Sequence, residues 1–385
     1  MENAVDKAIE TFISGCWKKV NDYYKDAICG KNVYIYGSGV YGKFLYNALS
    51  HLGYSKQIIC FINDYVTSDG EVLFNLPIKK SSNITFNDDD VIVVGIQNCS
   101  GVIKKIKDQG LNYIIADYDQ SFYQNNLMYT VYQCIDVSDI AYMPGKIKQF
   151  YSKFYEASDE ILSLYNEEFS RNVIQNRLNF YRTGDVSYID QIPVNYHQYF
   201  QDDYYSISDE EVFVDCGAFD GDTIKQFITF TEGKYKKIIG IEPDTISFKK
   251  LREFTQNNPN VTLFCCATGK EKTKLNFSSK GVLGSSFSEE EIGELTDICR
   301  LDDLLGSERV SLIKMDIEGA ELDSLIGAEQ IIKKNKPKIA VCIYHKMGDI
   351  ITIPKYLHSI VPEYCFKVRQ HSQTMLETVL YAEVK

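Results

Sequence analysis

The chain of 385 residues lacks several features that mark common protein classes. It has no run of about 18 apolar residues, so we expect no transmembrane helix. Its first residues, MENA, hold neither a basic nor an apolar segment, which predicts that no secretory signal is present. The cysteines number eleven, an odd count, and include no C-x-x-C pair, which argues against a disulfide framework and a zinc ribbon. These absences predict a cytoplasmic protein.

Positive charge is also scarce. The formal net charge is −12 and the isoelectric point is about 5.0, so we expect no nucleic-acid partner, because phosphate backbones are bound by clustered lysine and arginine. A small anionic ligand stays compatible with this charge, since a local field can oppose the net charge. The hydrophobic fraction of 44% and the length predict two or three folded domains.

Short apolar runs alternate with helical stretches in the first third of the chain. A helical pattern covers residues 5–29, and the β-rich runs and helices that follow are expected at 32–36, 40–52, 58–62, 91–95, 100–109 and 113–116. Strand and helix alternation of this kind gives a parallel sheet. We therefore predict an N-terminal Rossmann-like domain over residues 1–120.

A different composition separates this part from the second half. Residues 120–145 are polar and rich in tyrosine, residues 147–181 have a charged helical pattern, and residues 183–208 hold turn formers and acids. We predict a helical connector over residues 121–209. The alternation of strand and helix resumes at residue 212 and continues, which predicts a second α/β domain over residues 210–385.

A glycine-containing turn follows the first strand of the second domain. The strand 212–214 leads to Asp215, and Gly217 and Gly221 lie on the turn into the next helix, where a ligand can approach the backbone closely. An acid at this place repels a phosphate and favours a cation such as the ammonium of S-adenosylmethionine (SAM). Glu242 ends the next strand and is suited to accept hydrogen bonds from ribose hydroxyls. The alternative is that Asp215 caps a helix and Glu242 is a solvated strand end.

Two further strand ends carry titratable side chains. Asp316, Glu318 and Glu321 follow the strand 310–315, and His345 follows the strand 338–343. Clustered acids often mark sites, and a histidine titrates near neutral pH, so His345 or one of these carboxylates is a candidate general base. The alternative is a surface histidine. No spacing in the sequence requires a metal ion.

These segments resemble a known family. The sequences VDCGAFDGDT (214–223), GIEPD (240–244), GSSF (284–287), RLDDLL (300–305), LIKMDIEGAELDSLIGAE (312–329) and YHK (344–346) are similar to those of FkbM-type methyltransferases, a branch of the Rossmann-like class I methyltransferases. The resemblance covers about residues 145–385. It implies a seven-stranded, mostly parallel sheet with one antiparallel strand near the C-terminus, SAM as the methyl donor, and O-methylation of a sugar or polyketide hydroxyl.

The resemblance also implies the roles of individual residues. The methionine end of SAM would lie against Asp215, Gly217 and Gly221, the ribose against Glu242, and the transferring methyl near Asp316. Phe219 departs from the small or polar residue of many relatives and would narrow the pocket mouth. The full predicted set is, for the cofactor, Asp215, Gly217, Ala218, Phe219, Gly221, Asp222, Thr223, Glu242, Pro243, Asp244, Ala267, Ser285 and Ser286, and, for catalysis, His345, Asp316 and Glu318.

The first domain carries a glycine loop of its own. Gly37, Gly39 and Gly42 follow a strand and open a helix, and Asp64 ends the second strand, which is the dinucleotide fingerprint in its usual context. The unit over residues 31–116 also resembles the small nucleotide-binding domain that precedes bacterial sugar acetyltransferases and binds a nucleotide-sugar. Three interpretations stay open: a nucleotide-sugar site, a vestigial packing domain, and NAD-dependent chemistry.

The leading hypothesis is a SAM-dependent O-methyltransferase that modifies a sugar hydroxyl of a glycan, a nucleotide-sugar or a secondary metabolite. One rival is an NAD-dependent nucleotide-sugar oxidoreductase or epimerase, which needs a Tyr-x-x-x-Lys pair that Tyr151-Ser152-Lys153 does not supply. The other is a non-catalytic nucleotide-binding scaffold. The expected partners are a small-molecule or glycan acceptor, a nucleotide-sugar at the N-terminal domain, and a second copy of the chain in a homodimer.

Overall fold

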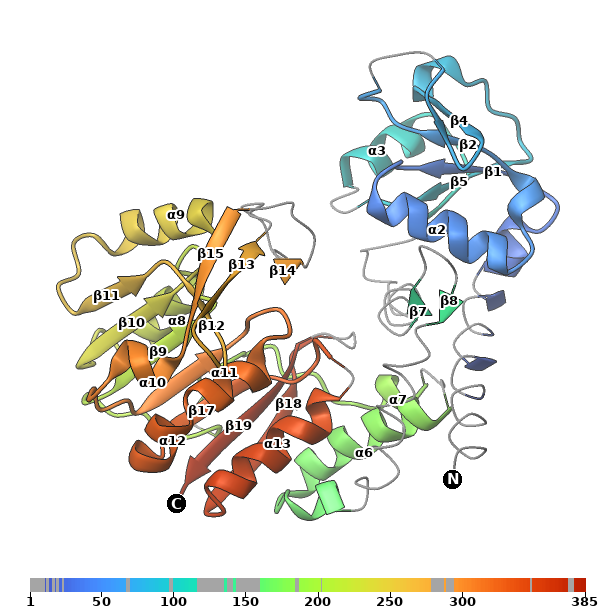
Figure 1. Ribbon diagram of the computed structural model, residues 1–385. Helices are drawn as coiled ribbons and strands as arrows, with labels where there is room; N and C mark the ends of the chain where they lie inside the picture. The colour runs from blue at the N-terminus through green and yellow to red at the C-terminus, as the bar shows by residue number, and fades with distance from the viewer. Residues whose placement is uncertain are drawn as a thin grey trace. The chain divides into compact units, whose positions relative to one another are not determined.

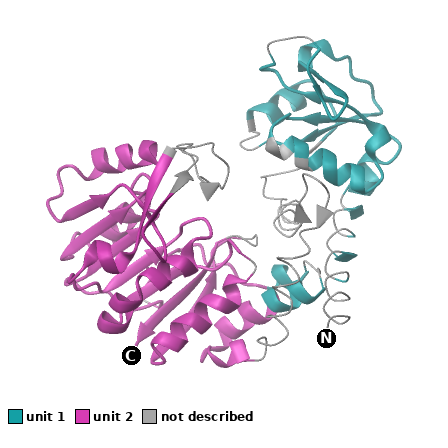
Figure 2. Cartoon of the chain, in the orientation of Figure 1, with its two compact units in different colours: residues 1–153, 177–191 teal, residues 154–176, 192–385 magenta. Residues whose placement is uncertain are grey.

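The computed structural model divides the chain into two compact units (Figure 2). Unit 1 comprises residues 1–153 and 177–191, and unit 2 comprises residues 154–176 and 192–385. The residues described are 11, 14–15, 18, 21–22, 24–66, 70–96, 100–115, 135–136, 141–142, 160–183, 187–201, 203–277, 287–288, 294–346, 348–372 and 377–385. The domain limits at residues 120 and 209 stay a prediction.

Unit 1 contains a six-stranded sheet with the order β3-β4-β2-β1-β5-β6, in which every neighbouring pair is parallel except β3 and β4 (Figure 1). Its elements are β1 (Asn32–Tyr36), α2 (Val40–His51), η1 (Ser55–Gln57), β2 (Ile58–Ile62), β3 (Val72–Leu73), β4 (Leu76–Lys79), η2 (Ser81–Asn83), β5 (Asp90–Val94), α3 (Ser100–Asp108) and β6 (Tyr113–Ile115). The α/β fold that the sequence predicts here is confirmed.

The central strands of unit 1 are apolar on both faces, as parallel strands covered by helices must be. Val33, Ile35, Cys60, Phe61 and Val93 are fully buried. The sequence does not predict the hairpin formed by β3 and β4, because four residues of β4 and two of β3 are too short to show an alternating pattern.

Along the chain, four described elements lie between β6 and the strand that begins at residue 212. They are β7 (Ile135–Asp136), β8 (Ala141–Tyr142), α6 (Glu168–Thr183) and α7 (Ser187–Asp190). The helix α6 begins within the predicted helical stretch 147–181 and ends two residues after it. Most of the helix predicted over residues 5–29 lies outside the described residues.

Unit 2 is built on a seven-stranded sheet with the order β11-β10-β9-β16-β17-β19-β18. The strand β19 alone runs opposite to the other six strands, which confirms the predicted sheet with one antiparallel strand. In Figure 1 the helices α11, α12 and α13 lie over one face. The strands are β9 (Val212–Cys216), β10 (Lys237–Ile241), β11 (Val261–Phe264), β16 (Leu312–Met315), β17 (Lys338–Cys342), β18 (Tyr364–Gln370) and β19 (Thr378–Val384).

The helices of unit 2 follow the strands as a crossover fold requires. They are α8 (Asp222–Phe230), α9 (Thr245–Thr255), α10 (Leu301–Leu305), α11 (Glu321–Gly327), α12 (Glu329–Asn335) and α13 (Asp349–Ile360). A second, four-stranded sheet, β12-β15-β13-β14, was not predicted from the sequence. Its strands are β12 (Ala267–Thr268), β13 (Thr273–Phe277), β14 (Phe287–Ser288) and β15 (Glu294–Cys299), which carry too few apolar residues to stand out.

The amino edge of the large sheet is held by a buried acid. Glu211 is 1% exposed, directly before β9, and its Oε1 accepts hydrogen bonds from Lys338 Nζ at 2.5 Å and from the Ser208 amide at 3.0 Å. Its Oε2 accepts a hydrogen bond from the Ser311 hydroxyl. Because these partners precede or begin three adjacent strands, the acid fixes β9, β16 and β17 in register.

Among the described helices, none has the length and apolar composition needed to cross a bilayer. The two ends of the large sheet differ in character: the amino edge is closed by saturated polar contacts, and the carboxyl edge carries the candidate functional residues. Since β19 is antiparallel, its first residues lie at this same carboxyl edge.

Candidate active site

Asp215 lies inside the carboxyl edge of the sheet, one residue before the end of β9. Its side chain is fully buried, and the Lys314 ammonium on the neighbouring strand β16 lies 3.0 Å from Oδ1. The other oxygen, Oδ2, accepts no hydrogen bond from the residues that the structure describes. Burial raises the pKa of Asp215 to about 6, and Lys314 opposes this rise. Buried polar atoms normally form hydrogen bonds, so the Oδ2 of Asp215 is available to accept one from a ligand.

The turn after β9 is shaped by its glycines. Gly217 has a φ of +78°, and a Cβ added there would lie 2.0 Å from the Asp316 carbonyl oxygen. Gly221 has a φ of +96° and precedes α8, where Phe254 would meet an added Cβ at 2.7 Å. Phe219 adopts a φ of +46° without being glycine. Only glycine fits at positions 217 and 221, and the strained turn between them is typical of functional loops.

Glu242 follows β10 and is 6% exposed. Its Oε2 accepts a hydrogen bond from the Phe219 amide and its Oε1 one from the Asp244 amide, each at 2.8 Å. Burial raises the pKa of Glu242 to about 7, although these two amides favour the ionised form. Each carboxylate oxygen keeps a lone pair for a further donor.

Asp244 has a structural task that accounts for its position. Its Oδ1 accepts hydrogen bonds from the amides of Ile246 and Ser247, both at 2.9 Å, so it caps the N-terminus of α9. Asp244 therefore has the helix-capping role that the sequence analysis left open for Asp215. Asp222 similarly bonds the Thr223 amide in the first turn of α8.

The remaining residues predicted at the cofactor site vary in exposure. Ala218 is buried next to Gly217, and Thr223 is buried in α8. Ala267 is buried on β12 in the small sheet. Pro243 is half-buried between Glu242 and the α9 cap. Ser285 and Ser286 lie outside the described residues.

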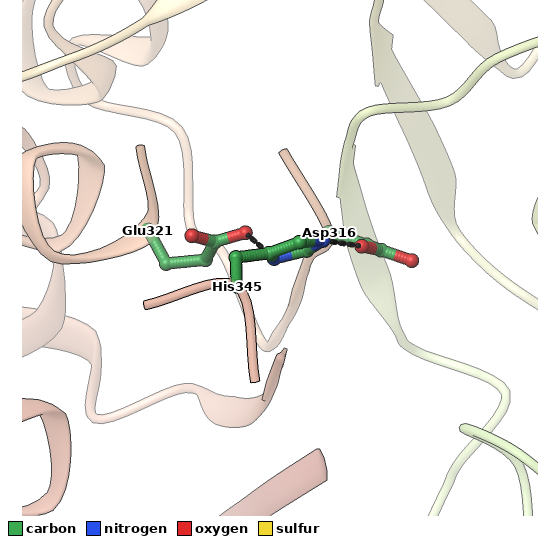
Figure 3. Close-up of side chains that lie close together, drawn as sticks. All are labelled: Asp316, Glu321 and His345. Carbon is green, nitrogen blue, oxygen red and sulfur yellow. Dashed lines mark ion pairs between the residues drawn. The ribbon is translucent and has the colours of Figure 1, made fainter. Parts of the chain in front are cut away.

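His345 lies between carboxylates, as Figure 3 shows. Its Nδ1 is 2.8 Å from Glu321 Oε1, and its Nε2 is 3.5 Å from Asp316 Oδ1 and 3.6 Å from Glu318 Oε2. The His345 side chain is 9% exposed, so it is not a surface histidine. Burial alone would lower the pKa of His345, but Glu321, Asp316 and Glu318 raise it to about 9.

Glu321 orients this imidazole. It is fully buried at the start of α11, and its Oε1 also accepts a hydrogen bond from the Ile317 amide at 2.9 Å. A carboxylate at Nδ1 holds the proton on that nitrogen and leaves Nε2 to exchange protons with the site. Glu321 was predicted as one of several candidate bases; its geometry fits the supporting role of fixing the histidine.

Donor atoms of Asp316, Glu321 and His345 lie within 4.8 Å of one another, a spacing that a metal site would need. However, the two carboxylates face different ring nitrogens, Glu321 facing Nδ1 and Asp316 facing Nε2. A histidine ligates one ion through one nitrogen. The arrangement therefore favours an oriented imidazole over a metal centre.

Two aromatic side chains that the sequence did not single out complete the site around Asp316. The Tyr199 hydroxyl donates to Asp316 Oδ2 at 2.9 Å, and its ring lies 5.5 Å from the Lys314 ammonium. The Tyr344 ring packs against the His345 ring, with the centroids 4.1 Å apart and the ring planes tilted by 37°. Burial would raise the pKa of Asp316, but Lys314 and His345 hold it below its ordinary value. Asp316 is therefore ionised at neutral pH.

Glu377 is a second residue that the sequence did not single out. It precedes the antiparallel strand β19 and so lies at the carboxyl edge, with the Tyr344 hydroxyl 3.5 Å from its Oε1. The side-chain amide of Gln198 donates a hydrogen bond to Glu377 Oε2 at 2.7 Å. The sequence signal for Glu377 was that the family resemblance extends over residues 145–385, whereas no pattern distinguished Tyr199 within the predicted connector.

The glycine loop of unit 1 is explained in part by packing. A Cβ on Gly42 would lie 2.0 Å from the Gly37 carbonyl oxygen, and one on Gly37 would lie 2.6 Å from the Gly95 carbonyl oxygen. Gly39, by contrast, has open space at its Cβ position and begins α2 without a side-chain cap. Gly37 and Gly42 are needed for backbone contact, and Gly39 is the position left for a ligand.

Asp64 is fully engaged within unit 1. Its Oδ2 accepts from the Tyr36 hydroxyl at 2.5 Å and from Lys105 at 2.7 Å, and its Oδ1 accepts from the Ser81 amide at 2.8 Å. Burial would raise the pKa of Asp64, but these donors hold it well below its ordinary value. An adenosine ribose would have to compete with them for the same oxygens.

Solved structures similar to this chain include several methyltransferases. A methyltransferase FkbM from Methylobacillus flagellatus KT has a similar fold over 99% of this chain and 100% of that chain, with a TM-score of 0.61 and 22% identity. A ribosomal RNA methylase from Streptococcus thermophilus is 14% identical over 46% of this chain and 90% of its own, with a TM-score of 0.31. A fibrillarin from Aeropyrum pernix, solved with S-adenosyl-L-methionine, is 13% identical over 46% of this chain and 69% of that chain, with a TM-score of 0.28.

No curated protein sequence matches the chain. A family model does match, and its description is the methyltransferase FkbM domain, over residues 215–368. That stretch begins at Asp215 and includes Glu242, Asp316, Glu321 and His345, which the structure gathers along one edge of a single sheet. Residues 215–368 therefore match the FkbM methyltransferase domain, and this part of the chain is a methyltransferase domain.

Proposed function

We propose that the protein transfers the methyl group of SAM to a sugar hydroxyl of a glycan, a nucleotide-sugar or a secondary metabolite. The observation that carries this proposal is the set of incompletely bonded acids at the carboxyl edge of the large sheet, above all Asp215 with its unused Oδ2. SAM brings an ammonium and a sulfonium and no phosphate, which is the charge that such an edge favours.

The side chains at this edge fit the cofactor. An ammonium would satisfy the buried Oδ2 of Asp215, which has no donor among the described residues. Gly217 and Gly221 pack closely against Asp316 and Phe254 at positive φ, which fixes the path of the turn that follows Asp215. Glu242 uses one lone pair of each oxygen on amides and has capacity for two ribose hydroxyls. We assign the methionine end to Asp215, Gly217 and Gly221 and the ribose to Glu242.

We assign the adenine to the neighbourhood of Ala267, which lies buried on β12. Ser285 and Ser286, predicted on the same ground, stay a prediction because they fall outside the described residues. Of the other predicted residues, Ala218, Phe219, Asp222 and Thr223 shape the turn into α8, and Pro243 and Asp244 shape the entry to α9. Their contribution is the shape of the site more than direct charge recognition.

The bound cofactor supplies an activated methyl group, so the chemical demand on the protein is modest. The chain has to align the acceptor oxygen with the methyl group and accept the hydroxyl proton as the new carbon–oxygen bond forms. We propose His345 Nε2 as the proton acceptor, with Asp316 and Glu318 beside it to hold the acceptor hydroxyl and stabilise the imidazolium. With its pKa raised to about 9, the basic form of His345 increases as the pH rises from 7 to 9.

Calorimetric titration with SAM tests the cofactor site. Wild type is expected to bind, and Asp215→Asn is expected to lose about 10- to 100-fold in affinity, because a hydrogen bond to a charged group is worth about 1.5–3 kcal/mol. Glu211→Gln is the matched control, since it changes an equally buried acid at the amino edge of the same strand. If wild type does not bind SAM, the proposal fails; if both variants weaken equally, the effect is one of folding.

The protonation of His345 can be followed by NMR of the histidine side chains. Wild type is expected to show one histidine that titrates near pH 9, and Glu321→Gln should move that midpoint down, because the main hydrogen-bonding carboxylate is removed. His371 is an internal control, since burial lowers its pKa to about 4. A midpoint near 6.5 in both proteins would contradict the assigned orientation. With an acceptor in hand, undiminished turnover of His345→Ala would transfer the role of base to a carboxylate.

The folded-state pKa also sets the sign of its effect on stability. Since the pKa of His345 is raised above the ordinary value of 6.5, its ion pairs stabilise the fold fully below that value. This contribution is lost as the pH rises through about 9. His345 therefore favours the folded state at neutral pH while it is protonated.

For unit 1 we propose a nucleotide-sugar site at the glycine loop, with Gly39 as the point of close approach and the ligand's diphosphate at the start of α2. The three donors that already bind Asp64, namely Tyr36, Lys105 and Ser81, weigh against NAD, because its ribose would have to compete with them at that strand end. The packing roles of Gly37 and Gly42 alone would equally suit a domain without a ligand.

Titration with UDP-glucose and with NAD separates these alternatives. We expect UDP-glucose to bind and Gly39→Val to abolish binding, since a side chain there meets no protein atom but would block the backbone from a diphosphate. The unchanged unfolding temperature of this variant would serve as the control. Binding of neither ligand would favour the packing domain, and binding of NAD alone would restore the redox hypothesis.

The homodimer and the division at residues 120 and 209 stay predictions. Of the rival functions, the scaffold hypothesis leaves the convergence of Asp215, Glu242, Asp316 and His345 without purpose. The methyl-transfer proposal accounts for all four.

A further inference from the structure

Lys314 is the one buried lysine in the part of the chain that the structure describes. It lies on β16 between Asp215 on β9 and the site around Asp316, and its side chain is 4% exposed. It lies inside an apolar strand and within the segment 312–329 that carries the family resemblance, but it was not among the predicted site residues. A lysine is seldom buried to this extent unless its charge is paired.

The contacts of its ammonium are complete. Nζ lies 3.0 Å from Asp215 Oδ1, donates to the Gly217 carbonyl oxygen at 2.8 Å, and faces the Tyr199 ring at 5.5 Å. Burial would lower the pKa of Lys314, but Asp215 and Asp316 hold it above its ordinary value, so the charge is kept. One cation thus connects the acid and the glycine that begin the cofactor turn.

The backbone around Gly217 makes this connection consequential. Gly217 approaches the Asp316 carbonyl so closely that no Cβ fits, and its φ of +78° is held between two strand ends. The Gly217 and Ala218 amides both donate to the Ile241 carbonyl oxygen. The carbonyl of Gly217 has Lys314 as its donor, so the ammonium sets the direction in which this peptide group points.

We propose that Lys314 is the positioning residue of the cofactor site, whose buried ammonium keeps Asp215 ionised and fixes the Gly217 peptide so that Asp215 Oδ2 is presented to the ammonium of SAM. This inference rests on the proposed function, because it assigns the ion pair to the SAM site. The opposing possibility is that the pair contributes only to folding, as Lys338 and Glu211 do at the amino edge.

The two roles differ in their pH dependence. The charged groups that face Asp215 are Lys314 on β16, Asp222 in α8 and Asp316 after β16. Lys314 is the only cation among them, and both acids, like burial, favour protonation of Asp215. Without Lys314, Asp215 would stay protonated at neutral pH and would ionise only in more alkaline solution.

The experiment is calorimetric titration of the full chain with SAM at pH 7 and pH 9, on wild type and Lys314→Met. Because Glu242 and His345 also titrate in this range, the wild-type affinity at each pH is the reference, and the readout is the ratio of variant to wild-type affinity. Lys314→Met should bind about tenfold more weakly or worse at pH 7 and regain part of the loss at pH 9, as Asp215 ionises. Lys314→Gln, which keeps a donor for the Gly217 carbonyl, should show the same recovery from a smaller loss and serves if the first variant does not fold.

Lys338→Met is the matched control. It removes the ion pair with Glu211 from the other edge of the same sheet, so it should lower the unfolding temperature and leave SAM affinity unchanged. Lys314 variants that bind SAM within twofold of wild type at both pH values, or that lose affinity equally at both, would overturn the inference. Absence of SAM binding by wild type would instead overturn the proposed function, so the two failures are distinguishable.

Discussion

The buried pair of Asp215 and Lys314 is the interaction on which the carboxyl edge of the large sheet depends. Two charges inside a sheet are costly to desolvate, and such a pair is weak evidence for stability by itself. Its value lies in what it orders: the end of β9, the peptide of Gly217 and, through Tyr199, the side chain of Asp316. The cofactor half and the catalytic half of the site thus share one cation.

The contrast between the two edges of this sheet explains where function resides. At the amino edge Glu211 is buried, and each of its oxygens accepts a hydrogen bond from a donor of the protein. At the carboxyl edge Asp215 keeps an unused oxygen, and Glu321 and Asp349 each keep one as well. Buried acceptors without donors cost free energy in the absence of a ligand, and proteins retain such groups mainly where a ligand satisfies them.

His345 illustrates how the site combines burial with charge. The imidazole is almost completely removed from water, which would favour its neutral form, yet three carboxylates favour the cation more strongly. Glu321 holds Nδ1, so the exchangeable nitrogen is the one beside Asp316. In the proposed mechanism, the acids that orient His345 also raise its affinity for the proton of the acceptor hydroxyl.

The sequence could predict the parts of this account that follow from local pattern. The strands ending at Asp215, Glu242 and Asp316 are short apolar runs bounded by acids and glycines, and they were predicted correctly, whereas the single antiparallel strand was implied by the family resemblance. The FkbM resemblance added the family. Gly217 and Gly221 were also interpretable, because a tight turn with close backbone approach needs glycine.

What the sequence could not supply depends on distance in space. Tyr199 reaches Asp316 across 117 positions, and no local pattern distinguishes it from other tyrosines in the predicted connector. The capping by Asp244 and the saturation of Asp64 likewise depend on which amides and side chains the fold brings near. The small sheet was missed because its strands have little apolar alternation and pair with distant segments.

The most direct test of the central claim is a crystal structure of the full chain with S-adenosylhomocysteine. The account predicts the ligand at the carboxyl edge of β9, with its ammonium at Asp215 Oδ2, its ribose hydroxyls at Glu242, and its sulfur toward Asp316 and His345. A ligand bound anywhere else, or an Asp215 that contacts Lys314 alone in the complex, would contradict the account.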